Sequence, residues 1–151
     1  MSRIYEEIEI EGKKVKVKID TGSDFPLSLR KELINELGLP MHPTIKAQVF
    51  REEEGKPKTE LEPTWTAETN IRGCKLILPI VEAKGDNLLG NTLLQKMKAS
   101  IDAGKDGISF TECPKSPWFI DKEKRIFELT GNFVLTGYCG EGKLGEFVGS
   151  L

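Results

Sequence analysis

The stretch Val15-Lys16-Val17-Lys18-Ile19-Asp20-Thr21-Gly22-Ser23 joins a β-strand pattern to a run of small polar residues. Apolar residues at 15, 17 and 19 alternate with lysines, as in a strand with one buried face. Asp20 keeps the parity of the lysines, and the three residues after it are too small to fill a core. Gly22 permits a backbone turn that a side chain would obstruct. These residues alone leave two interpretations open: a carboxylate oriented for function, or a strand end closed by an Asx-type turn.

The composition excludes several classes of protein. The chain of 151 residues is long enough for one domain with a sizeable core, or one domain with an appendage. Its net charge of −2 is spread along the sequence, which predicts no nucleic-acid partner. The only histidine, His42, falls in a predicted loop, which argues against a histidine-dependent triad. We therefore expect no metal and no cofactor.

The cysteines and the apolar runs bear on the location of the protein. Cys74, Cys113 and Cys139 are odd in number and widely spaced, with no CxxC pair. This spacing argues against a disulfide framework or a zinc site and favours a reducing compartment. The first residues lack the apolar run of a signal peptide, and no apolar run is long enough to span a bilayer. We expect a cytoplasmic protein without membrane contact.

Most of the chain is predicted to form short strands separated by turns. One helix is predicted from the N-cap Ser28 to a stop at Gly38, and a second, shorter one after Gly90. The near-regular turns predict an all-β class, a barrel with one or two short helices. The predicted strands cover residues 4–10, 14–20, 45–49, 59–69, 74–81, 99–102 and 108–110.

A strongly polar segment, residues 51–58, separates two of these strands and contains the turn-forming Gly55. It predicts a long hairpin with a charged tip. The hairpin is interpreted either as a solvated surface element or as a lid over a site.

Two motifs in the chain are similar to those of a known family. Ile19-Asp20-Thr21-Gly22-Ser23, followed downstream by Leu88-Leu89-Gly90-Asn91-Thr92-Leu93-Leu94, resembles the two signatures of the retroviral-type aspartic proteases, the retropepsins. The resemblance spans about residues 4–111. It implies a retropepsin-like acid protease barrel, a single lobe that forms a homodimer, with a protease domain over residues 1–112. Residues 113–151 are then a C-terminal extension, expected either to add strands to the barrel or dimer interface, or to cover the cleft or bind a partner.

The resemblance also implies roles for individual residues. Asp20 is expected to be catalytic, Thr21 to hold the loop of the partner subunit, and Ser23 to belong to the same active-site loop. Gly22 and Asp24 are expected to bind the main chain of a peptide or protein substrate. Gly55 is expected at the tip of the flap that covers it.

The chemistry requires a second carboxyl group. In aspartic proteases one carboxyl takes a proton from water while the other donates to the carbonyl oxygen, and two such groups about 3 Å apart share one proton. No other Asp-Thr-Gly or Asp-Ser-Gly occurs in the chain, so the partner must come from a second copy. The predicted function is an aspartic endopeptidase; a catalytically silent peptide-binding or scaffold module remains the alternative.

Overall fold

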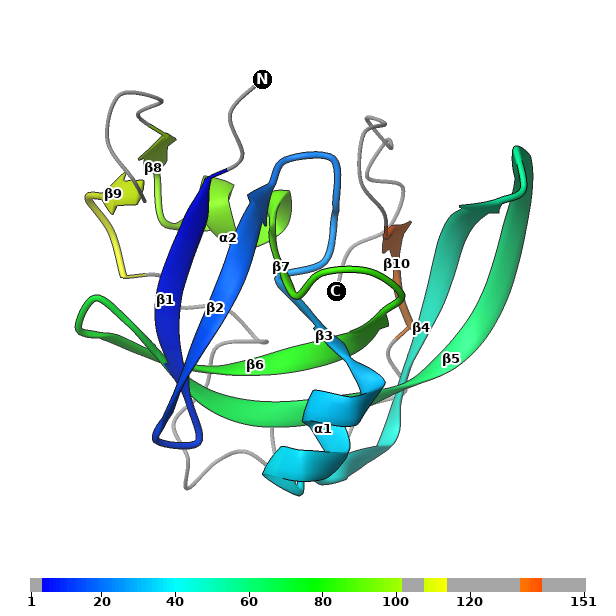
Figure 1. Ribbon diagram of the computed structural model, residues 1–151, viewed down its shortest axis with the longest axis horizontal. Coiled ribbons are helices and arrows are strands. Elements are labelled where there is room, and N and C mark those ends of the chain that lie inside the picture. The colour runs from blue at the N-terminus through cyan, green and yellow to red at the C-terminus, as the bar shows by residue number, and fades with distance from the viewer. Residues whose placement is uncertain (1–3, 102–107, 114–133, 140–151) are drawn as a thin grey trace.

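The computed structural model describes residues 4–101, 108–113 and 134–139. Strands make up most of the described part, and the helices α1 and α2 are too short to cross a membrane (Figure 1). The prediction of a mostly β fold with two short helices is confirmed. The elements are β1 Tyr5–Ile10, β2 Lys13–Asp20, β3 Leu27–Arg30, α1 Lys31–Leu37, β4 Met41–Glu53, β5 Lys56–Ile71, β6 Cys74–Ala83, β7 Leu88–Gly90, α2 Asn91–Lys96, β8 Ala99–Ile101, β9 Ile108–Phe110 and β10 Val134–Tyr138.

Eight of the strands form one sheet in the order β1-β2-β7-β3-β6-β5-β4-β10. β1 pairs in addition with β5, so the six strands β1, β2, β7, β3, β6 and β5 form a closed series of pairings. β4 and β10 extend the sheet beyond β5, and β8 and β9 form a separate hairpin. The long β4–β5 hairpin therefore projects from one side of the fold, as Figure 1 shows.

Three tight turns set the register of the hairpins. Each has two residues with φ between 49° and 88°, as a type I′ turn requires, and each ends in glycine, which adopts positive φ without strain. These X-Gly pairs connect β1 to β2, β4 to β5 and β5 to β6, and they are Glu11-Gly12, Glu54-Gly55 and Arg72-Gly73.

The core is divided between the two faces of β6. Leu76, Leu78 and Ile80 belong to the main cluster, whereas Ile77 and Val81 point to the other side. The continuous apolar run of β6 is therefore buried on both faces. The side chains on the other side form what we call the second cluster: Phe25, Ile45, Ala47, Val49, Ile77, Val81, Leu88 and Cys139.

The predicted start of the first helix is wrong. Ser28 lies in β3, fully buried, where it is opposite Val81 of β6 and Leu88 of β7. The helix begins at Lys31 without a side-chain cap. Pairing on both edges of β3 outweighs the local capping preference of serine, because each ladder satisfies backbone groups that a cap could not. The predicted end is confirmed, since Gly38 has φ 64° and donates its N–H to the carbonyl of Asn35.

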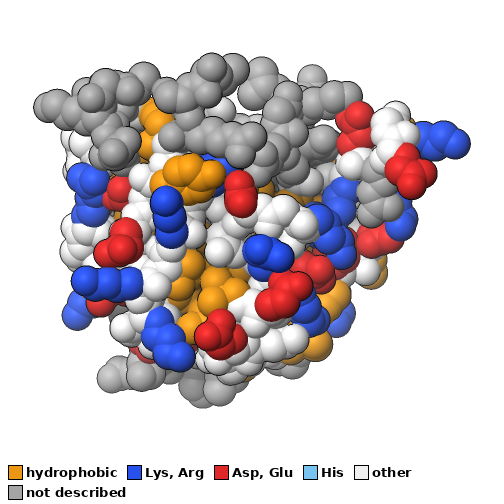
Figure 2. All heavy atoms as spheres, in the orientation of Figure 1, with side chains coloured by type: hydrophobic (Ala, Val, Ile, Leu, Met, Phe, Trp, Pro, Cys, Tyr) orange, Lys and Arg blue, Asp and Glu red, His pale blue; other side chains and the backbone are white. Residues whose placement is uncertain are grey.

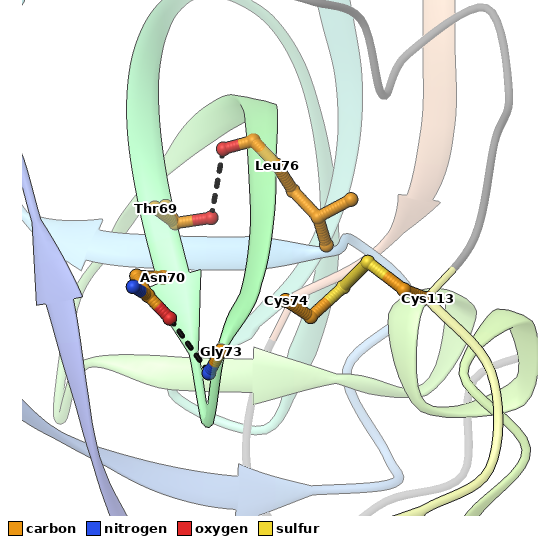
Figure 3. Close-up of a disulfide and its surroundings, with 6 residues drawn as sticks. All are labelled: Thr69, Asn70, Gly73, Cys74, Leu76 and Cys113. Carbon is orange, nitrogen blue, oxygen red and sulfur yellow. Dashed lines mark hydrogen bonds between the residues drawn. A yellow bond between two sulfur atoms is a disulfide. The ribbon is translucent and has the colours of Figure 1, made fainter.

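The prediction that the cysteines form no disulfide is also wrong. Cys74, the first residue of β6, is bonded to Cys113, which follows β9, with the Cα atoms 5.5 Å apart (Figure 3). The two are separated by 39 positions, so only the fold brings them together. The third, Cys139, is a free buried thiol. The disulfide adjoins the Arg72-Gly73 turn, where the Asn70 side chain accepts the N–H of Gly73 at 2.8 Å.

The C-terminal extension is described over residues 134–139. β10 pairs in parallel with β4, from Val134 opposite Lys46 to Tyr138 opposite Phe50. The rest of the extension, residues 114–133 and 140–151, lies outside the described residues. The division into domains at residue 112 stays a prediction.

Candidate active site

Asp20 is the last residue of β2 and lies in a frame made by three strands. β7 runs parallel to β2, with Gly90 opposite Asp20, and antiparallel to β3, with Leu89 opposite Leu27. β7 is therefore inserted between the strand that enters the loop of residues 21–26 and the strand that leaves it. The two sequence motifs are neighbours in space, and the loop is held at both ends.

Backbone groups fix the orientation of the Asp20 carboxylate. The N–H of Gly22 donates to Oδ1 of Asp20 at 2.9 Å, and the N–H of Ser23 donates to the Asp20 carbonyl at 3.2 Å. The first of these bonds closes an Asx-type turn, as one of the two interpretations of the motif predicted. A hydrogen bond to an ionised carboxylate is about twice as strong as a neutral one, and it holds this group in one direction. Asp20 is 8% exposed.

The segment that follows β7 secures the other side of the loop. The N–H of Gly90 donates to the Pro26 carbonyl at 3.0 Å, and the N–H of Asn91 donates to the Ser23 carbonyl at 2.7 Å. The hydroxyl of Thr92 donates to the carbonyl of Asp24. Neither motif by itself predicts these contacts, since the two lie far apart in the sequence and a threonine at position 92 has no distinctive pattern.

Gly90 is required by the close approach of the loop. A Cβ atom at this position would lie 1.8 Å from the carbonyl oxygen of Phe25 and 2.8 Å from that of Ser23. Both obstacles are backbone atoms, which cannot rotate away as a flexible side chain could. The glycine of the downstream motif therefore sets the distance between β7 and the loop after Asp20.

The structure brings five of the predicted site residues together in one loop. Thr21 is exposed, whereas Gly22, Ser23 and Asp24 are buried, with Ser23 at 0% and Asp24 at 3% exposure. The Ser23 hydroxyl has no hydrogen-bond partner within the described residues. Gly55 is placed apart from them, exposed at the turn of the β4–β5 hairpin.

The hairpin has an exposed charged tip and a buried ion pair further down. Figure 2 shows acidic and basic side chains intermixed over the projecting hairpin. The exposed charged residues near its tip are Glu52, Glu54, Lys56 and Lys58. No single-sign surface results.

The buried ion pair joins Arg51 of β4 to Glu62 of β5. It has an N···O distance of 2.8 Å and a second bond of 3.2 Å, and Arg51 is only 5% exposed. Arg51 also donates to the carbonyl of Glu82 in β6 at 2.7 Å. Burial acts to lower the pKa of Arg51, but Glu62 and the nearby Cys139 raise it above its ordinary value. No sequence pattern predicts this pair, since Arg51 is the first residue of a strongly polar segment.

His42 lies in a strand rather than in the predicted loop. It lies in β4, 5% exposed, and its Nδ1 accepts the N–H of Ile45 at 3.0 Å. Burial lowers the pKa of its imidazole. The pairing of β4 with β5 is irregular between Met41 and Lys46, and His42 lies in this irregular part of the strand. Over residues 4–101, 108–113 and 134–139, no group of three His, Cys, Asp or Glu side chains is placed to hold a metal ion.

Comparison with solved structures shows a retropepsin-like fold. The EIAV protease, solved with the inhibitor HBY-793, matches with a TM-score of 0.51 and 19% identity, over 67% of this chain and 93% of that chain. The retroviral protease-like domain of Ddi1 from Leishmania major covers 82% of this chain and 97% of its own, with a TM-score of 0.48 and 14% identity. The simian foamy virus (mac) protease covers 62% and 94%, with a TM-score of 0.43 and 14% identity. No protein-family profile and no curated protein matches the sequence. The predicted resemblance is confirmed as a fold.

Proposed function

We propose that the protein is an aspartic endopeptidase that acts as a homodimer, with one Asp20 from each copy. The observation that carries the proposal is the Asp20 loop, in which the carboxylate accepts the N–H of Gly22 at 2.9 Å and the surrounding backbone is bonded to the segment after β7. This loop occurs in a retropepsin-like fold. A carboxylate aimed by its own backbone and held at both ends of its loop is suited to act on a bound peptide.

The reaction needs one ionised and one protonated carboxyl group. The ionised Asp20 takes a proton from a water molecule as the water oxygen bonds to the scissile carbonyl carbon, and the protonated Asp20 donates its proton to the carbonyl oxygen. The tetrahedral species then collapses: its C–N bond breaks, the amine nitrogen receives the proton of the Asp20 carboxyl that had taken it from water, and one hydroxyl of the tetrahedral carbon gives its proton to the other Asp20 carboxylate as the new carboxyl group forms. The two aspartates return to their starting state.

The second carboxyl group comes from another copy of the chain. The sequence contains a single Asp-Thr-Gly motif, and twofold symmetry would place the same residue of each copy on one axis. Thr21 next to Asp20 is exposed in the single chain, so its hydroxyl is accessible to the loop of a partner. This supports the proposed dimer contact.

Three further residues are proposed to contact substrate. The N–H of Gly22 is bonded to Asp20, which leaves its carbonyl as the group offered to a peptide N–H. Asp24 lies in the wall of the same loop, 3% exposed. Gly55 lies at the exposed turn of the hairpin, where nothing is within 4 Å of an added Cβ, so the tip is accessible to a partner molecule.

The test is the pair of variants Asp20→Asn and Asp86→Asn, which make the same chemical change in the site and in the turn between β6 and β7. Both are incubated with a diverse peptide mixture from pH 3 to pH 7.5, and products are identified by mass spectrometry. We expect cleavage by the wild type and Asp86→Asn, blocked by a transition-state-mimic inhibitor, and none by Asp20→Asn. An active Asp20→Asn protein would refute the assignment.

Mixing the two forms tests the shared site. When wild type and Asp20→Asn are combined in equal amounts and allowed to exchange subunits, roughly half of the wild-type activity is expected to remain, because mixed dimers lack one carboxyl group. Activity that is unaffected by added Asp20→Asn protein, or a cleaving species that sediments as a monomer, would contradict the dimer.

A peptide-binding module without turnover is the second candidate. The charged hairpin tip favours it, since Glu54 and Lys56 flank the position expected to close over a substrate. This candidate predicts peptide binding with no inhibitor-sensitive cleavage at any pH, which the same incubation distinguishes.

A further inference from the structure

The outer edge of β4 pairs with a second strand from the same chain. β5 occupies one edge of β4, and β10 occupies the other in parallel register over residues 134–138. The pairing continues one residue further, where the N–H of Cys139 donates to the carbonyl of Phe50 at 3.0 Å. The outer edge of β4 over residues 46–50 therefore accepts an extended peptide through main-chain hydrogen bonds, as in recognition by strand addition.

The end of this added strand reaches the frame that holds Asp20. Cys139 is 4% exposed and packs in the second cluster with Phe25, from the loop after Asp20, and Leu88, from β7. Its Sγ lies 3.6 Å from the hydroxyl of Ser28 in β3. In Figure 1, β10 lies between the β4–β5 hairpin and the loop that joins β2 to β3. The residue that ends this pairing therefore packs against the loop after Asp20 and against β7.

The sequence of this segment suits a peptide that binds by its main chain. Residues 129–140 carry no charge, whereas Glu128 and Glu141 stand at either side. The segment belongs to the same chain as β4, so its pairing is intramolecular and does not depend on the concentration of the protein. A weak strand pairing is therefore sufficient to keep the edge filled.

We propose that the outer edge of β4 is the peptide-binding edge of this protein and that β10 is its internal occupant, competing with peptides that come from outside. The inference rests on the proposed function for the identity of those peptides as substrates, but the competition itself requires no catalysis. While β10 is paired, an external peptide binds only to the fraction of molecules whose edge is open, so its apparent affinity is reduced by that fraction.

A proline placed in β10 tests this competition. Because the N–H of Cys139 faces β4, alternation along the strand also turns the N–H of Gly137 toward β4 and that of Thr136 away. Gly137→Pro removes a ladder donor, and Thr136→Pro makes the same substitution on the outward side. Cys139→Asp is a second, independent variant, since it puts a carboxylate among apolar side chains; Cys139→Ala is its control.

The probe is a fluorescein-labelled synthetic peptide of residues 132–141, added to full-length chains and followed by fluorescence anisotropy. We expect Gly137→Pro and Cys139→Asp to bind it roughly ten-fold more tightly than the wild type, Thr136→Pro and Cys139→Ala. In these two variants the kcat/KM for cleavage of a reporter peptide is expected to rise by a similar factor, through a lower KM. Equal binding by all five proteins would overturn the proposal.

Two further outcomes separate this proposal from the others. The binding series is repeated with Asp20→Asn added to each protein. If the differences in affinity are retained there, and none of the proteins that keep Asp20 cleaves the reporter peptide, the protease proposal is refuted and the competition is supported. If Gly137→Pro and Cys139→Asp both lose cooperative unfolding by circular dichroism, β10 is an integral strand and the competition is refuted.

Discussion

Replacing Gly90 with alanine tests whether β7 positions the loop after Asp20. The new methyl group would lie 1.8 Å from the carbonyl oxygen of Phe25, whereas ordinary contact begins at 3.4 Å. Because the opposing atoms belong to the backbone of the loop, relief requires β7 and the loop to separate by roughly 1.5 Å, a shift that a close-packed interior resists.

The expected cost follows from that displacement. Overpacking of this kind destabilises by about 1–3 kcal/mol. The bonds from Gly90 to Pro26 and from Asn91 to Ser23 span the same gap and would be stretched as it opens. Since a misplacement of about 1 Å at a catalytic group can cost about 100-fold in rate, we expect kcat/KM to fall by at least that factor.

The assay combines urea unfolding, followed by circular dichroism, with cleavage kinetics of a reporter peptide. Gly12→Ala is the control, because nothing lies within 4 Å of its added Cβ and only the strain of φ +80° is introduced. We expect Gly12→Ala to lose about 1 kcal/mol of stability and no activity. A Gly90→Ala protein with the unfolding midpoint and activity of the wild type would refute the reasoning, and an unchanged midpoint alone would refute the steric part of it.

Three other predictions concern stability. The Cys74–Cys113 disulfide closes a loop of 39 positions, so reduction should lower the free energy of unfolding by about 4 kcal/mol, and identical urea curves with and without reductant would contradict it. Burial lowers the pKa of His42 in the folded protein, so its contribution to stability is fully present above pH 6.5 and is lost as the pH falls through the lowered pKa; a His42→Gln protein should lack this pH dependence in its unfolding curves. Arg51→Met should cost about 3–5 kcal/mol because it leaves the Glu62 carboxylate buried alone, and Arg51→Met with Glu62→Leu should cost less, so a double variant at least as unstable as the single one contradicts this account.

The strands and turns could be predicted because their information is local. The alternation at Val15, Val17 and Ile19 specifies a half-buried strand by itself, and Glu11-Gly12 specifies the turn before it. The position of Asp20 at the strand end follows directly. The same holds for the short helix after Gly90, because Met97 follows Leu93 and Leu94 by four and three positions and all three are buried.

The features that the sequence did not predict all depend on distant partners. Ser28 has the properties of a helix cap, and only β6 and β7 on either side make it a strand residue. The disulfide joins cysteines whose spacing carries no signal, and the burial of Arg51 depends on a glutamate eleven positions away and a carbonyl on β6. Such pairings are created by the topology, which no short window of sequence contains.

The candidate site divides in the same way. The resemblance of the two motifs to those of the retropepsins indicated Asp20 and its loop. That β7 lies between β2 and β3, and that β10 pairs with β4, required the structure, since these pairings join segments far apart in sequence.

The two interpretations of the β4–β5 hairpin apply to different halves of it. Below the tip, Arg51 is bonded to Glu62 and to the carbonyl of Glu82, and Ile45, Ala47 and Val49 are buried in the second cluster, so this half is fixed to β6. Beyond Arg51 the charged residues Glu52, Glu54, Lys56 and Lys58 are exposed, and neither core cluster includes a residue of positions 52–60. A lid motion of the proposed flap would therefore be confined to the part of the hairpin beyond Arg51. β10 pairs with residues 46–50, which lie in the fixed half, so the edge it occupies is already formed before any peptide arrives. Binding to such an edge requires only the release of β10, and the charged tip has no part in creating it.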